Sequence, residues 1–136
     1  RTASRIARHQ IKNIPRKKPE LARMYEMVNE AVGTLNGKDL IPFGQLLDES
    51  WKLKRTLSDK ISTSHIDDLY AAATRAGAIG GKLLGAGGGG FVLLFVEPHK
   101  KPKVRAALKG LLEVPFKFEG LGSQIIFYQP DTGIVK

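Results

Sequence analysis

The residues with the clearest capacity for chemistry are glycines. Eight of the 15 glycines fall between Gly77 and Gly90, in the run GAIGGKLLGAGGGG, and five of them occupy the six positions from Gly85 onward. A backbone without Cβ atoms can adopt positive φ angles repeatedly and lets another backbone or a phosphate approach to contact distance. Two interpretations follow: the loop packs tightly against a neighbouring segment, or its N–H groups face an anionic ligand.

The surroundings of this run exclude two familiar kinds of glycine-rich loop. Short apolar segments, Gly81 to Leu84 and Phe91 to Val96, lie on both sides, so a flexible linker is not expected. A P-loop is excluded because no Gly-Lys-Ser/Thr follows the glycines and no helix is predicted to begin there. Such a loop must be positioned by the two segments that it joins.

Positive charge is the second chemical feature. The formal net charge is +9, yet residues 1–23 hold eight basic side chains and one acidic one. A basic arm of this kind can bind nucleic acid or another anionic surface through phosphate contacts, or it can be the solvated face of an exposed helix. The arm has no aromatic residue to stack on bases and no nucleic-acid recognition motif, which favours the solvated helix.

Composition excludes several classes of protein. The chain is 42% hydrophobic, too apolar for a disordered tail, and it lacks the cysteines of a disulfide scaffold. Its longest apolar run has six residues, whereas a membrane-spanning helix needs roughly 20. His9, His65 and His99 have no metal-ligand spacing, so we assign no metal site. A soluble, cytoplasmic domain with a real core is expected.

The first half of the chain has helical periodicity. After the basic arm and the break at Pro15 to Pro19, a second helix carries one apolar stripe, and two more helices are expected from Asp39 and from Ser64. Asp39 is predicted to cap the third helix, and Ser64 with Asp67 approximates a capping box for the fourth. The predicted stripes are Leu21, Tyr25, Val28, Val32 and Leu35; then Leu40, Phe43, Leu47 and Trp51; then Ile66, Leu69, Tyr70, Ala73 and Ala76.

Beyond Gly77 the pattern becomes that of strands. Two apolar strands flank the glycine loop, and Pro98 opens a basic helix whose core side is predicted to carry Val104, Leu108, Leu111 and Leu112. Residues 114–118 alternate, residues 125–128 are apolar, and residues 119–122 between them read as a hairpin turn. This order predicts an α+β fold, with a small antiparallel four-stranded sheet and helices on one face.

The stretch from Gly77 to Phe91 resembles the third signature motif of the GHMP kinase superfamily, which includes galactokinase, homoserine kinase and mevalonate kinase. Three flanking segments, residues 61–70, 122–128 and 1–4, resemble the branch of sugar kinases related to D-glycero-D-manno-heptose 7-phosphate kinase. The resemblance covers essentially the whole chain. It implies a ferredoxin-like C-terminal domain of a sugar kinase.

Kinases of this superfamily have two domains, and the resemblance matches residues 1–136 to the second. The N-terminal domain carries the loop Pro-x-x-x-Gly-Leu-Gly-Ser-Ser, which cradles phosphates, and the catalytic carboxylate; neither occurs here. Residues 120–123 repeat Gly-Leu-Gly-Ser, but they join two predicted strands and open no helix that could hold an anion. The resemblance therefore implies no catalytic residue in this chain, and it implies that ATP and Mg²⁺ bind through the missing N-terminal domain.

The resemblance also implies where ligands lie. It assigns the glycine loop to the wall of the cleft between the two domains, beside nucleotide and sugar, with Lys82 either facing that cleft or solvated. Arg1 and Arg5 are candidates to meet the substrate phosphate, or they belong to a basic helix face. The loop positions are Gly85, Ala86, Gly87, Gly88, Gly89 and Gly90. Expected partners are the protein's own N-terminal domain and a sugar phosphate, neither membrane nor nucleic acid; a homo-oligomer is left open.

The intact protein is therefore expected to phosphorylate the anomeric hydroxyl of a heptose 7-phosphate with ATP, in the synthesis of nucleotide-activated heptose. The 136-residue chain alone is expected to be inactive, because it lacks half of the site. The rival hypothesis is a basic α+β module that binds RNA. A linear fall of log affinity with log salt concentration in gel shifts would favour that rival.

Overall fold

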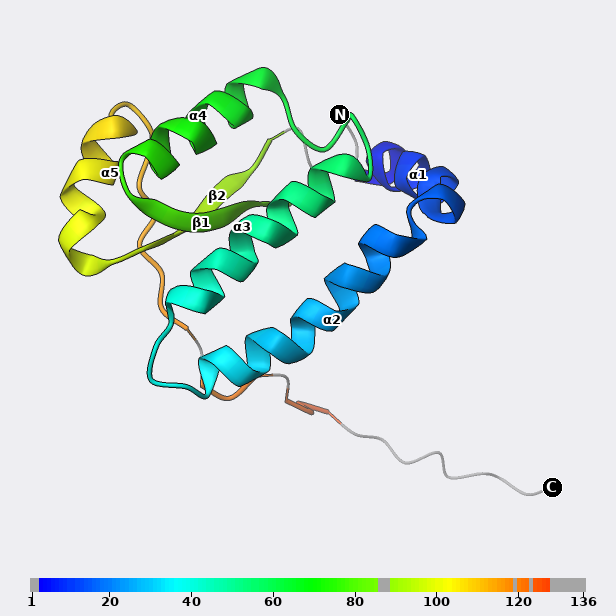
Figure 1. Cartoon of the computed structure of the whole chain (residues 1–136), viewed down its shortest axis with the longest axis horizontal. Helices are drawn as coiled ribbons and strands as arrows, with labels where there is room; N and C mark the ends of the chain where they lie inside the picture. Colours follow the sequence, from blue (N-terminus) through cyan, green and yellow to red (C-terminus); the bar gives the residue numbers. More distant parts are fainter. Residues whose placement is uncertain (1–2, 86–88, 119, 123, 128–136) are drawn as a thin grey trace.

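The computed structural model describes residues 3–85, 89–118, 120–122 and 124–127, and it shows a helical layer packed on a β-hairpin (Figure 1). The described part follows the predicted order through the fifth helix. In chain order the elements are α1 (Ala3–Asn13), a 3₁₀ turn (Ile14–Arg16), α2 (Lys18–Leu35), α3 (Ile41–Thr56), α4 (Ser64–Arg75), β1 (Ala78–Leu84), β2 (Phe91–Val96), a second 3₁₀ turn (Pro98–Lys100) and α5 (Lys101–Ala107).

The two predicted strands that flank the glycine loop are present and pair with each other. β1 and β2 are antiparallel, with Ala78 opposite Val96 and Leu84 opposite Phe91, and the register is irregular between Ala78 and Gly80. Helices α3 and α4 lie on one face of the hairpin (Figure 1). The hairpin thereby holds the two ends of the glycine loop side by side.

The prediction of four strands is wrong for the described residues, whose sheet has two strands and carries no ferredoxin-like arrangement. Residues 114–118 alternate in sequence but form no strand, and Phe118 is 90% exposed. An alternating pattern becomes a strand only where it finds a ladder partner, and Pro115 lacks a donor for such a ladder. Residues 125–127 are also exposed and form no strand; residues 119, 123 and 128 of the predicted hairpin lie outside the described part.

The main core lies between α3, α4 and β1. Trp51 of α3 and Ile61 of the connection to α4 are the largest fully buried side chains, at 1% and 0% exposure. They pack with Leu57, Ile66, Tyr70 and Leu83. Trp51, Ile66, Tyr70 and Ala73 confirm the predicted inner faces of α3 and α4, although Leu40 is exposed.

Helix α2 is rotated relative to the prediction. Its expected core stripe is exposed from Tyr25 onward, with Tyr25 itself 76% exposed, and Met27 is the buried residue. Of the predicted stripe, Leu21 does pack against the main core, and it is joined there by Met24, which was not predicted. The apolar residues of α2 cover two adjacent faces, so periodicity alone does not select one. In the observed rotation the Arg23 guanidinium pairs with Glu49 of α3, with Nε 2.7 Å from Oε1.

Helix termini differ from the predictions by one residue. The residue before α3 is Leu40, although the Asp39 carboxylate still accepts a hydrogen bond from the Ile41 N–H at 2.9 Å. The cap of α4 is Thr63 and not Ser64, with Thr63 Oγ1 accepting from the Ile66 N–H at 3.3 Å. Helix α5 ends at Ala107, which leaves Leu111 and Leu112 exposed beyond it, while Val104 is buried and Leu108 packs partly, as predicted.

Glycine lets α3 and β1 approach each other closely. A Cβ atom on Gly80 of β1 would lie 2.0 Å from the Gly44 carbonyl oxygen and 2.8 Å from the Asp48 nitrogen of α3. Above this contact, the Tyr70 hydroxyl of α4 donates a hydrogen bond to Asp48 Oδ1 at 2.7 Å. Burial, and then the Asp48 carboxylate, raise the pKa of Tyr70. This hydroxyl therefore stays protonated and ties α4 to α3.

We predict that Tyr70→Phe lowers the free energy of unfolding by about 1 kcal/mol, the usual net value of a hydrogen bond. The loss stays small because Asp48 keeps its ion pair with Lys52, at 2.6 Å. Urea unfolding measures the change, and Tyr25→Phe, on an exposed ring, is the matched control. Equal effects of the two substitutions would contradict a structural role of the Tyr70 hydroxyl.

Candidate functional site

The two ends of the glycine loop lie at one end of the molecule. The C-terminal end of α3, the start of α4, the end of β1 and the start of β2 all lie there (Figure 1). Gly85 and Gly90, at the two ends of the loop, have φ angles of +110° and +125°. A Cβ on Gly90 would lie 2.3 Å from the Leu84 carbonyl oxygen, whereas Gly89 has open space around it.

These glycines decide between the two interpretations only in part. At Gly90 the requirement for glycine comes from close packing against β1, which is the first interpretation. The open surroundings of Gly89 leave room for an approaching group. Ala86, Gly87 and Gly88 lie outside the described residues, so the second interpretation, N–H groups that face an anion, stays a prediction.

Lys82 lies on β1 close to the start of the loop. Side chains alternate along a strand, so Lys82 shares the face of β1 that Gly80 turns toward α3. Its side chain is half-buried, as is that of Lys54 on α3. Burial, and then the positive charge of Lys82, lower the pKa of Lys54 from its ordinary value. The ammonium groups of Lys54 on α3 and Lys82 on β1 therefore repel each other.

The sequence analysis missed Lys54, although a signal for it exists. Lys54 lies about three helical turns beyond Phe43, on the same face of α3. The Phe43 ring meets the Phe95 ring of β2 edge to face, with centroids 6.1 Å apart. A lysine that shares a helix face with an aromatic residue packed against the sheet also faces the sheet.

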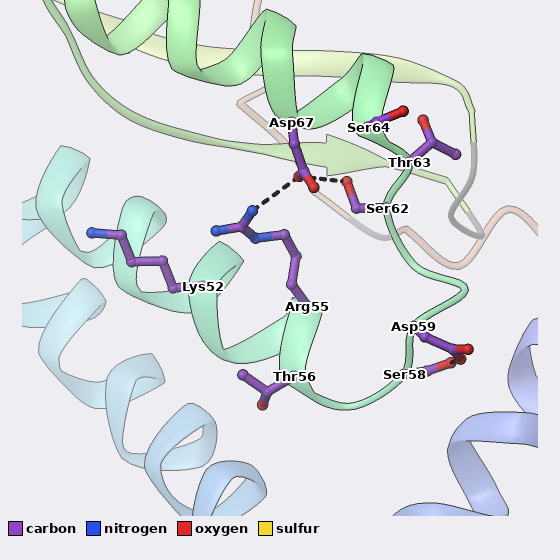
Figure 2. A pocket seen from close by; sticks show the side chains of 9 residues that line it. All are labelled: Lys52, Arg55, Thr56, Ser58, Asp59, Ser62, Thr63, Ser64 and Asp67. Carbon is purple, nitrogen blue, oxygen red and sulfur yellow. Dashed lines mark hydrogen bonds and ion pairs between the residues drawn. The ribbon is translucent and has the colours of Figure 1, made fainter.

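A pocket of about 480 Å³ opens between the end of α3 and the start of α4 (Figure 2). Figure 2 shows Arg55, Ser62 and Asp67 pointing toward one another across it. Arg55 Nη1 donates to Asp67 Oδ1 at 2.9 Å, and Ser62 Oγ donates to the same oxygen at 2.8 Å. The remaining lining residues are Lys52, Thr56, Ser58, Asp59, Thr63 and Ser64. Closely spaced hydroxyl, carboxylate and guanidinium groups can hydrogen-bond a polyhydroxylated ligand.

Helix α1 is attached to the same end of the molecule. His9 Nδ1 and Ser58 Oγ are 2.8 Å apart, and Asn13 Nδ2 donates to the Leu57 carbonyl at 2.9 Å. The structure thus gives His9, which carried no assignment from sequence, a role in packing. The basic side chains Arg8 and Lys12 of this helix are exposed.

The two arginine candidates are not positioned by the structure. Arg1, and the side chain of Arg5 on α1, lie outside the described residues. Within the described part, no group of three His, Asp or Glu side chains is arranged to hold a metal ion. The same part contains no helix with the length and hydropathy to cross a bilayer.

Comparisons with known proteins agree on one family. The profile described as "GHMP kinases C terminal" matches residues 31–113. The D-glycero-alpha-D-manno-heptose 7-phosphate kinase of Campylobacter jejuni is 38% identical over 71 residues, which cover 52% of this chain and 21% of that enzyme. The mevalonate kinase of Pyrococcus horikoshii is 36% identical over 101 residues, covering 66% of this chain and 30% of that enzyme.

A solved structure supports the fold. The mevalonate kinase of L. major, in complex with R-mevalonate, superposes with a TM-score of 0.67 at 24% identity, over 80% of this chain and 34% of that one. The chain thus spans between about a fifth and a third of the length of these relatives.

Proposed function

Because the chain belongs to the GHMP kinase family, we propose that the intact protein transfers the γ-phosphoryl group of ATP to the anomeric hydroxyl of a heptose 7-phosphate. The observation that carries the choice of acceptor is the 38% identity to the Campylobacter jejuni heptose 7-phosphate kinase over residues that make up half of this chain. The product would serve the synthesis of nucleotide-activated heptose.

Phosphoryl transfer depends on positioning and on neutralising charge, and the described residues suit such a supporting role. The closely packed ends of the glycine loop give the ligand cleft a rigid wall. Lys82 and Lys54 supply positive charge beside that wall, and the polar pocket next to Arg55 offers hydrogen bonds to sugar hydroxyls.

We assign ATP and Mg²⁺ to an N-terminal domain outside this chain, which would be its principal partner. The 136-residue chain alone would then lack activity, and turnover of ATP by that purified chain with heptose 7-phosphate would contradict the division.

A substrate panel tests the choice of acceptor. In a coupled assay of ADP release, we expect the intact protein to use heptose 7-phosphate with a kcat/KM about 100-fold or more above that for galactose or mevalonate. The expected margin corresponds to about 3 kcal/mol, the usual value of charged contacts made only by the preferred substrate. Preference for mevalonate or galactose would overturn the acceptor and leave the family unchanged.

A further inference from the structure

Two half-buried lysines below the glycine loop lack the partner that such groups normally have. Within the described part of the chain, neither Lys54 nor Lys82 forms an ion pair or a hydrogen bond through its ammonium group. Other basic side chains do pair with a carboxylate, namely Lys17, Arg23, Lys52, Arg55 and Arg105. Buried charges are ordinarily paired. Half-buried lysines without an ion pair also occur elsewhere in the described structure, at Lys60 and Lys100; what distinguishes Lys54 and Lys82 is that their two charges interact with each other.

The fold brings these two lysines together from separate elements. Gly80 contacts the backbone of α3 directly, and Lys82 follows it by two residues on the same face of β1. On α3, Lys54 continues the face whose Phe43 ring meets Phe95 of β2. Both side chains therefore enter the α3–hairpin interface near the point where β1 enters the glycine loop.

Their proximity is unfavourable in the free protein. Like charges that are partly removed from water repel each other, and the lowered pKa of Lys54 reflects both burial and the charge of Lys82. Hydrophobic side chains of similar length would fill the same space without this repulsion. A bound group with two negative charges would instead attract both lysines at once.

We propose that Lys54 and Lys82 together bind a phosphoryl group at the loop end of the hairpin. Lysine suits this task as a point charge with three donors, and two lysines from different elements fix the position of the anion. The identity of the ligand rests on the proposed function: the phosphoryl group belongs either to the phosphorylated sugar or to the nucleotide. Binding of a phosphoryl group by the two lysines is proposed for either ligand.

The first experiment uses inorganic phosphate as the probe and needs no kinase activity. Thermal unfolding of the intact protein is followed in rising phosphate at constant ionic strength, for wild type, Lys54→Met, Lys82→Met and the double variant. Lys103→Met, an exposed lysine on α5, is the matched control. We expect each single variant to require about tenfold more phosphate for the same rise in melting temperature, and the double variant to show no rise.

The sign of the difference in melting temperature between variant and wild type, without and with phosphate, separates phosphate binding from a merely structural role. Without phosphate, Lys54→Met and Lys82→Met should melt at or above the wild-type temperature because the repulsion is gone; with phosphate, wild type should melt higher. Equal responses of wild type and double variant to phosphate would overturn the proposal. So would a variant that melts lower than wild type without phosphate and responds normally when it is added.

Steady-state kinetics then identify the source of the phosphoryl group. A KM for heptose 7-phosphate raised about tenfold or more in both variants, with the KM for ATP unchanged, assigns the sugar phosphate; the opposite pattern assigns the nucleotide. Unchanged values for both would overturn the proposal. If the wild-type protein phosphorylates no heptose phosphate at all, the proposed function fails, and the phosphate titration still decides the lysine site.

Discussion

Gly80→Val should prevent the domain from folding stably. The Cβ alone would lie 2.0 Å from the Gly44 carbonyl oxygen, and both opposing groups, this oxygen and the Asp48 nitrogen, belong to the backbone of α3. A backbone in the middle of a helix cannot move away as a flexible side chain can, so α3 would have to separate from β1. We expect a loss of more than about 3 kcal/mol, measured by urea unfolding.

Gly33→Ala is the matched control for this substitution. Gly33 lies within α2, and a Cβ there would meet no atom within 4 Å. The substitution should stabilise the protein by up to about 1 kcal/mol, since alanine is the better helix former. A Gly80→Val variant as stable as wild type would show that α3 and β1 do not meet as described.

Gly90→Ala is expected to have the largest effect on activity. The residue has a φ of +125°, and its Cβ would lie 2.3 Å from the Leu84 carbonyl oxygen, so alanine both strains the backbone and opens the hairpin at the loop. We expect a stability cost of about 1–3 kcal/mol. In the proposed kinase, displacement of the cleft wall by an ångström should lower kcat/KM about 100-fold.

Gly89→Ala separates the two interpretations of the loop. A Cβ at Gly89 has open space, so this variant should keep the stability of wild type. If the loop only packs against its neighbouring strand, activity is also unchanged; if an anionic ligand approaches the loop, activity falls although the fold is intact. Gly33→Ala serves as the control for activity. For the preceding prediction, a Gly90→Ala enzyme with full activity would refute the role of the loop ends.

Local patterns in the sequence predict those features that depend on a few neighbouring residues. Helices α3 and α4 with their inner faces, the two strands that flank the glycine loop and the glycine requirement at the loop ends were all predicted. Side-chain periodicity follows from backbone geometry within one element, and a positive φ is a property of one residue. The glycine motif also predicted the family, and the profile match confirms that prediction.

Other features depend on partners that are distant in sequence. Residues 114–118 have a strand pattern yet pair with nothing in the described structure, because a ladder needs a second chain segment. The rotation of α2 depends on its fit against the rest of the fold, where Leu21 and Met24 pack on the main core and Arg23 pairs with Glu49 of α3. The carboxylate of Asp67, predicted to complete a local capping box, is instead held by Arg55 of another helix.

By itself, therefore, the amino-acid sequence determined the helices, the hairpin and the glycine motif, since each is encoded by residues close together along the chain. Only the tertiary structure decided that the charges of Lys54 and Lys82 interact and that hydroxyl groups from two helix ends share one pocket. These side chains come from α3, α4, the connection between them and β1. Such contacts depend on packing between elements, which no spacing within one element encodes.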